Sequence, residues 1–248
     1  MATQFENILI TREAGIIELR IHHRGGSAVW APWGGLHREL GLAFAEIAAD
    51  PEARVVVFTG TGDTFCAEFQ ADVDVPPMSA NIWDVIFREG RALLNNLLAI
   101  EVPVIAAVNG PAFIHAELPL LSDVVLASEN AVFADKPHAA NGVVPGDSVQ
   151  TVWPMLLGPN RGRYFLMTGQ EIDAREALSL GIVGEVLSAA DLMPRARELA
   201  RVIAARPAVA NRYTRVVLTR QIKERLAAEL DQGLAMEGMA ILAAMQVG

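Results

Sequence analysis

Histidines and carboxylates gather in one stretch of the chain, residues 112–153. It holds two of the five histidines, His115 and His138, and three carboxylates in polar or glycine-flanked settings, Glu117, Asp123 and Asp147. Apolar runs alternate there with Gly, Pro and Asn, which predicts short strands that lead into exposed turns. Side chains that do chemistry are commonly presented on such turns by a rigid scaffold. We therefore interpret this stretch as the candidate active site.

His138 and Asp147 form the pair best suited to general-base chemistry. Pro145 and Gly146 lie between them, so the chain can fold back and bring the two side chains together. A carboxylate that fixes the tautomer of an imidazole also stabilises the imidazolium. With an ordinary pKa of about 6.5, a histidine can take and return a proton near neutral pH. The same spacing also suits a surface histidine beside a turn aspartate.

Three further side chains have a chemical interpretation beside a structural one. His115 follows a Gly-Pro turn, where it could stabilise an oxyanion or simply bond to the backbone of a helix start. Glu117 could be an acid or base, or a helix first-turn residue that interacts with the dipole. Glu237 lies in a very apolar C-terminal helix, where a buried carboxylate needs a partner. It could therefore take part in a subunit contact, belong to a functional site or face solvent.

Two residues nearer the N-terminus complete the set of candidates. Trp30 is typical of a core, although an indole beside a pocket can also donate a hydrogen bond. His37 falls one position off the apolar stripe of a predicted helix, so we expect it to point partly outward.

Composition excludes several classes of function. The chain has 248 residues, 52% of them hydrophobic, which suffices for one full core or a domain with an appendage. A net charge of −9 without a basic cluster argues against nucleic-acid and anionic-membrane partners. Cys66 is the only cysteine, which excludes an internal disulfide and fits a reducing cytoplasm.

Several motifs are absent from the sequence. There is no secretory signal pattern and no apolar run of about 20 residues, so we expect a cytoplasmic protein without a membrane span. Neither HxH nor HExxH occurs, and no GxSxG or glycine-rich nucleotide loop is present. We therefore predict no metal and no cofactor.

The hydrophobic pattern predicts a mixed α/β protein with largely parallel sheets. Strands are expected over residues 7–11, 16–22, 54–59, 102–108, 123–127, 131–134 and 182–187. Helices are expected over residues 33–49, 82–100, 149–157, 161–167, 174–180, 189–205, 208–225 and 226–245, with Asn81 and Asp173 as caps. The shift to helices near residue 190 suggests a helical C-terminal subdomain.

Four ordered segments resemble the crotonase (enoyl-CoA hydratase/isomerase) superfamily. They read VVVFTGTGDTFCAE, VPVIAAVNGPA, NGVVPGD and MTGQEIDAREALSLGIVGEVL. The resemblance implies a crotonase-like ββα superhelix, with a core over residues 1–188 and a helical trimerisation subdomain over residues 189–248. It also implies a homotrimer or a dimer of trimers.

The departures from that family's pattern concern the oxyanion loops and the acids. Ile114-His115-Ala116 stands where a small, glycine-bearing loop is usual, and the bulkier Phe69 stands in the first loop. One of the hydratase's two glutamates aligns with Glu117, and the other aligns with His138. Only Lys136 and Lys223 supply lysine, which suits CoA phosphates poorly.

These departures are similar to the β-diketone hydrolases typified by 6-oxocamphor hydrolase. That resemblance implies a retro-Claisen cleavage of a small 1,3-diketone by water, without a cofactor. It implies that His138, oriented by Asp147, deprotonates water, and that His115 with the Trp30 indole donates to the enolate oxygen. Glu237 would hold the water or the imidazole, and His37 and Phe69 would line the substrate pocket.

Two other functions remain open on the sequence. One is a CoA-dependent hydratase, isomerase or lyase that uses Glu117 as its acid and base. The other is a ligand-binding paralogue that keeps the fold without catalysis.

Overall fold

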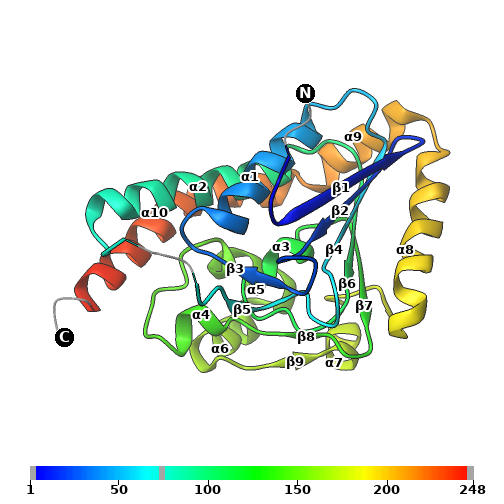
Figure 1. Cartoon of the computed structure of the whole chain (residues 1–248). Helices are drawn as coiled ribbons and strands as arrows, with labels where there is room; N and C mark the ends of the chain where they lie inside the picture. The colour runs from blue at the N-terminus through cyan, green and yellow to red at the C-terminus, as the bar shows by residue number, and fades with distance from the viewer. Residues whose placement is uncertain (1–3, 73–75, 245–248) are drawn as a thin grey trace.

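A six-stranded sheet, largely parallel, forms the centre of the molecule (Figure 1). The computed structural model describes residues 4–72 and 76–244. The sheet has the order β1-β2-β4-β6-β7-β10, in which only the β1–β2 hairpin is antiparallel. Its strands are β1 (Ile8–Glu13), β2 (Ile16–Ile21), β4 (Val55–Thr59), β6 (Val104–Val108), β7 (Val124–Ser128) and β10 (Glu185–Leu187).

Two short ribbons form a second layer beside this sheet. β3 (Ala28–Trp30) pairs in parallel with β5 (Cys66–Phe69), and β8 (Val132–Phe133) pairs antiparallel with β9 (Ile172–Asp173). Isolated bridges from Ala112 to Cys66 and to Phe133 link the two ribbons. The start of the candidate stretch is therefore fixed between two strands.

Ten helices surround the sheets within the described residues. They are α1 (Gly35–Ala48), α2 (Ala80–Ala99), α3 (Glu117–Leu120), α4 (Lys136–Ala139), α5 (Val149–Leu157), α6 (Pro159–Thr168), α7 (Ala174–Ser179), α8 (Ala189–Ala204), α9 (Ala208–Leu218) and α10 (Arg220–Ala244). α8 runs along one side of the sheet, whereas α1, α2 and α10 lie together on another (Figure 1).

The alternation of side chains along the central strands explains this layering. Val55 and Val57 of β4 pack with the α8 residue Leu192, together with Ile105 of β6. Their neighbours Val56 and Phe58 belong to the main core on the other side. Because successive strand residues point to opposite faces, a strand that is apolar throughout must be covered on both. The predicted mixed α/β fold, with a largely parallel sheet and a helical C-terminal part, is confirmed.

Two helix boundaries differ from the prediction. Ser79, rather than Asn81, caps α2, and its hydroxyl accepts a hydrogen bond from the backbone N–H of Ile82 at 3.3 Å. Both residue types are good caps, and the apolar pattern alone places the helix start too late. Asp173 does cap α7, since its carboxylate accepts from the N–H of Glu176 at 2.8 Å.

The last two helices are divided at Thr219, not at residues 225 and 226. Thr219 terminates α9, and its hydroxyl donates to the carbonyl of Arg215 at 2.7 Å. No glycine or proline marks this break, so the sequence carries no strong signal for it. Met245, the expected end of the last helix, and both outer ends of the predicted subdomains lie outside the described residues.

No helix among the described residues combines the length and the apolar character needed to cross a bilayer.

Candidate active site

A single cavity of about 270 Å³ collects the candidate side chains. Its wall is mostly apolar, with lining side chains from α2, α10 and the intervening loops that include Met78, Trp83, Ile86, Leu93, Leu94, Val143, Leu234 and Ile241. All seven site residues predicted from the sequence also line it: Trp30, His37, Phe69, His115, His138, Asp147 and Glu237. Five polar side chains thus converge on a largely apolar space.

His138 is fixed by a carboxylate that the sequence analysis missed. Nδ1 of His138 lies 2.6 Å from Oδ1 of Asp135, which precedes α4. Asp135 occupies the cap position but makes no side-chain bond to the helix backbone, because its carboxylate bonds to the ring instead. Asp135, and not Asp147, is therefore the partner that sets the ring's orientation.

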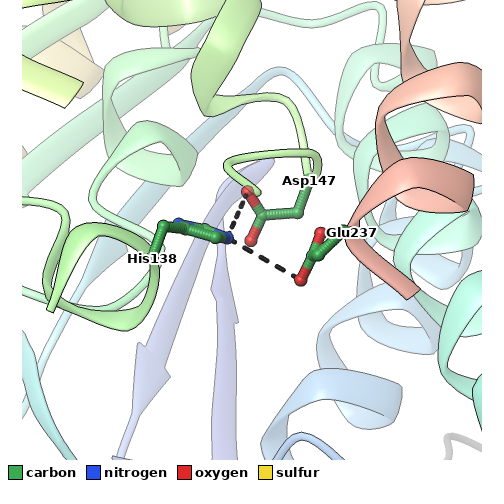
Figure 2. A group of neighbouring side chains, drawn as sticks. All are labelled: His138, Asp147 and Glu237. Atoms are coloured by element: carbon green, nitrogen blue, oxygen red, sulfur yellow. Dashed lines mark ion pairs between the residues drawn. The ribbon is translucent and has the colours of Figure 1, made fainter. Parts of the chain in front are cut away.

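The other ring nitrogen of His138 points at two carboxylates. Nε2 is 3.6 Å from Oδ1 of Asp147 and 3.7 Å from Oε1 of Glu237, as the dashed lines in Figure 2 show. These separations are ion pairs and exceed ordinary hydrogen-bond lengths. Asp147 stands on the loop before α5 and Glu237 on α10, so three separate elements meet at this point.

The electrostatics of this group keep a proton on the imidazole. Burial disfavours the charged ring, but the Asp147 charge, the hydrogen bond to Asp135 and the nearby Glu237 carboxylate outweigh it and raise the pKa of His138 to about 11. Burial raises the pKa of Glu237 to about 7, despite its pairing with His138. Burial opposes ionisation of Asp147 too, yet the nearby histidines hold its pKa below the usual range. At neutral pH the group holds His138 as an imidazolium beside ionised Asp147.

His115 is the second oriented imidazole. Its Nδ1 lies 2.7 Å from Oε1 of Glu117, and its Nε2 lies 3.4 Å from Oδ2 of Asp147. The ring packs against Trp30 with centroids 4.1 Å apart and planes inclined by 34°. Burial disfavours the imidazolium, but the charges of Glu117 and Asp147 outweigh it and raise the pKa of His115 to about 9.

The backbone at His115 has φ of +50°, in the left-handed region that favours glycine. A bulky side chain at such a position is uncommon and is found where the surroundings determine the conformation. Here the tilted contact with Trp30 and the hydrogen bond to Glu117 hold the ring toward the cavity.

His37 does not point partly outward, as its helical position suggested. It is 4% exposed and its Nδ1 lies 3.5 Å from Oε2 of Glu89. The buried face of α1 is broader than a single apolar stripe, because α2 packs closely against it at Gly41. A Cβ added to Gly41 would lie 3.3 Å from the backbone nitrogen of Leu93. Burial lowers the pKa of His37, so this ring is neutral near pH 7.

The position of Asp135 in the sequence does indicate its role. An aspartate directly before Lys-Pro-His occupies the cap of a short helix, which puts its carboxylate three residues before the ring. Asp123, by contrast, belongs elsewhere: it accepts a hydrogen bond from the buried guanidinium of Arg215 and from the backbone N–H of Val104. Through these two contacts, Asp123 connects α9 to strand β6 of the central sheet.

Comparison with known proteins identifies the family. The sequence profile described as Enoyl-CoA hydratase/isomerase matches residues 11–242. The chain belongs to this crotonase superfamily of enzymes. A carnitinyl-CoA dehydratase of Escherichia coli K12 is 36% identical over 199 residues, covering 79% of this chain and 74% of that protein. The dehydratase of Citrobacter koseri is 38% identical over the same length.

Solved structures of crotonase-superfamily proteins agree with the fold. One is a beta-diketone hydrolase from the cyanobacterium Anabaena, bound to (S)-3-oxocyclohexyl acetic acid, with a TM-score of 0.91 and 45% identity. The likeness covers 95% of this chain and 94% of that one. An enoyl-CoA hydratase/isomerase from Mycobacterium paratuberculosis has a TM-score of 0.85 and 28% identity, covering 95% and 93% of the two chains.

Within this crotonase-superfamily chain, Glu117 has a position that bears on the alternative functions. Its side chain is fully buried, bonds to His115, and is not among the described residues that line the cavity. Burial raises its pKa, although the charge of His115 opposes the shift. In this arrangement Glu117 reaches the cavity only through the His115 ring.

Proposed function

We propose that this protein hydrolyses a carbon–carbon bond of a small cyclic 1,3-diketone. The single observation that carries the proposal is the pair of imidazoles, each held at Nδ1 by a buried carboxylate and each presenting Nε2 to Asp147 in one apolar cavity. The likeness to the Anabaena beta-diketone hydrolase supports the same class of reaction.

The first step is attack of water on one carbonyl carbon. An oxygen–carbon bond forms, the π bond of the attacked carbonyl breaks to leave an alkoxide, and the water proton passes to the group of His138, Asp147 and Glu237. His138 starts as an imidazolium, so the group accepts a proton through its carboxylates, and Glu237, with a pKa of about 7, is the member poised to take it. The charged side chains of His138 and Asp147, next to Glu237, hold the water in place.

The second step breaks the bond between the attacked carbon and the carbon shared by the two carbonyls. The electron pair moves into the remaining carbonyl and gives an enolate. His115 is cationic near neutral pH, and its Nε2 faces the cavity, so it donates to the enolate oxygen. Preorganised donors aimed at developing charge stabilise the transition state more than the ground state. The stored proton then returns to carbon, which yields a keto acid.

The cavity supports a compact, uncharged substrate. A volume of about 270 Å³ with an apolar wall accommodates a small ring. The carnitinyl-CoA dehydratases among the relatives keep a CoA thioester reaction as the competing candidate. That reaction would require a free acid or base, whereas Glu117 is buried against His115.

The test is turnover of a cyclic 1,3-diketone beside crotonyl-CoA, followed by loss of each ultraviolet chromophore. We expect loss of the diketone alone, with one heavy oxygen in the carboxylate when the solvent is heavy-oxygen water. His138→Ala should lower kcat by about 10²- to 10⁴-fold. His22→Ala, a matched change outside the cavity, should have no effect. Turnover of crotonyl-CoA alone would contradict the proposal, and turnover of neither would favour a binding paralogue.

A further inference from the structure

The geometry points to a divalent transition-metal site made by Nε2 of His138 with carboxylate oxygens of Asp147 and Glu237. The three ligand atoms all lie within 4.8 Å of one another, and they come from α4, the loop before α5, and α10 (Figure 2). This site is new relative to the sequence-based expectation of no metal.

The distances suit one shared ion better than direct hydrogen bonds. Nε2 of His138 is 3.6 Å from the Asp147 oxygen and 3.7 Å from the Glu237 oxygen, too long for hydrogen bonds. Metal–ligand bonds of about 2.0–2.2 Å leave neighbouring ligands roughly 3.0–3.6 Å apart. The two pairs that include His138 need a contraction of at most a few tenths of an ångström to reach this range. The two carboxylate oxygens lie within 4.8 Å of each other and would turn further toward a common ion by side-chain rotation.

His138 has the carboxylate partner at its second ring nitrogen that is common for metal-binding histidines. Asp135 holds Nδ1 at 2.6 Å, which leaves Nε2 directed at the carboxylates. A carboxylate behind a ligating imidazole fixes the ring and raises its basicity. Sequence motifs for metal sites do not include such a set, because its three ligands lie far apart along the chain.

Two buried carboxylate oxygens of this group accept no hydrogen bond from the described residues. They are Oδ1 of Asp147 and Oε2 of Glu237. Both residues are only 9% exposed. Buried carboxylate oxygens are ordinarily paired or coordinate a metal. A dication would satisfy both carboxylates and replace the proton that His138 otherwise carries.

The donor set selects the ion. One imidazole and two carboxylates suit Zn²⁺, Co²⁺ or Mn²⁺, whereas Ca²⁺ prefers six to eight oxygen ligands. The cavity leaves room for water or a ligand to complete the coordination. We therefore use Zn²⁺ as the binding probe, Co²⁺ as the spectroscopic probe and Ca²⁺ as the negative control.

Occupation of the site has a consequence for the reaction. The ion would take the same atoms that accept the water proton, so Zn²⁺ should inhibit diketone hydrolysis. This inhibition rests on the proposed function, whereas metal binding itself does not.

The experiment is calorimetric titration of the purified, chelator-treated full chain with ZnCl₂ in the absence of substrate. We expect one ion per chain, release of a proton because His138 gives up its own, and no comparable signal with CaCl₂. CoCl₂ should produce a visible absorption whose intensity follows the same stoichiometry.

Substitutions of the proposed ligands test which residues bind the ion. Glu237→Gln and Asp147→Asn should each weaken Zn²⁺ binding by more than about 100-fold, and Asp135→Asn by about 10- to 100-fold. Glu229→Gln, on the same helix but bonded to Thr151 at 2.6 Å, should bind Zn²⁺ as the parent does. Circular dichroism checks that every variant is folded.

Two outcomes would overturn the site: no stoichiometric Zn²⁺ binding by the parent, or binding that survives in folded Glu237→Gln and Asp147→Asn. If Zn²⁺ binds as expected but neither diketone nor crotonyl-CoA is turned over, the site stands while the proposed reaction fails.

Discussion

At the scale of single residues, two imidazoles of the cavity have the same construction. Each holds Nδ1 against a buried carboxylate, Asp135 for His138 and Glu117 for His115. Each turns Nε2 to a different oxygen of Asp147. The difference is Glu237, which lies at ion-pair distance from His138 but not from His115 among the described residues. In the proposed reaction, this side of the cavity takes the proton.

Removal of the charge behind His138 tests the positioning role of Asp135. Asp135→Asn keeps the size of the side chain but replaces the ionic partner at 2.6 Å. We expect kcat to fall by about 10- to 100-fold, because the ring loses its fixed orientation and part of the attraction that keeps it protonated. Steady-state kinetics with a pH profile measures both effects. Asp84→Asn, an exposed matched change, should leave kcat and the profile unaltered.

The pKa of Glu237 predicts the pH dependence. Its ordinary value is 4.5, and burial raises it to about 7, so the carboxylate that accepts the proton is lost as the pH falls below 7. His115 must keep its proton, and with a pKa of about 9 it loses it at higher pH. A profile of log kcat/KM should therefore be bell-shaped, with limbs near these two values.

Glu237→Gln supplies the decisive comparison for that profile. The variant should be slower and should lose the acidic limb while it keeps the alkaline one. Retention of an unchanged acidic limb would assign that limb to a different group.

The sequence identified most of this site but not its internal pairing. Seven predicted residues line the cavity, because residue type and family pattern both mark them. The partner of each ring was harder to predict, since a carboxylate three residues away in a short helix competes with one nine residues away across a turn. Whether Asp135 or Asp147 faced Nδ1 depended on the conformation of residues 135–139, which periodicity does not determine.

At the scale of elements, the approach of α10 to the loop before α5 brings Glu237 beside Asp147 and His138. Gly146 and Gly233 meet backbone to backbone: a Cβ on Gly146 would lie 2.1 Å from the Gly233 carbonyl oxygen. A Cβ on Gly233 would lie 2.3 Å from the Gly146 carbonyl oxygen. Only glycine at both positions lets Glu237, one helical turn after Gly233, stand beside Asp147.

Gly233→Ala should therefore separate α10 from the loop. We expect a loss of about 1–3 kcal/mol in the free energy of unfolding from overpacking, and a loss of turnover larger than that loss of stability explains. Denaturant unfolding and kinetics at a temperature where both proteins are folded separate the two effects. Gly184→Ala, where the added Cβ would lie 3.6 Å from its nearest neighbour, should change neither.

Helices and strands were predictable where a local sequence pattern determines them. Strands β4 and β6 follow from apolar, β-branched runs, and α7 follows from the Asp173 cap. The burial of His37 and the break at Thr219 depend on which helices pack against α1 and α9. Those contacts join residues far apart in the chain, so no window of sequence contains them.

At the scale of the whole molecule, the cavity draws side chains from the beginning, middle and end of the chain. Trp30 precedes α1, His138 lies on α4, and Glu237 lies on α10. Helix α10 is thus part of the candidate site, because it supplies both a wall and a carboxylate.

The outer faces of those helices predict an oligomer. Tyr213, Val217 and Leu218 of α9 are 62%, 72% and 67% exposed, and Met239 of α10 is 71% exposed. Tyr213 and Val217 lie one helical turn apart on α9, and large apolar side chains exposed in this way are typical of a protein contact surface. We expect a second and third copy of this chain to cover them in a closed trimer, or in a pair of trimers.

Val217→Arg tests this expectation, because a cation buried in an apolar contact lacks a partner. Light scattering should give three or six chains for the parent and the 26.7 kDa of one chain for the variant. Leu178→Arg, on the exposed face of α7 far from α9 in Figure 1, should keep the parent's mass. A parent that is monomeric at micromolar concentration would exclude the trimer, and the cavity of a single chain would then be the complete site.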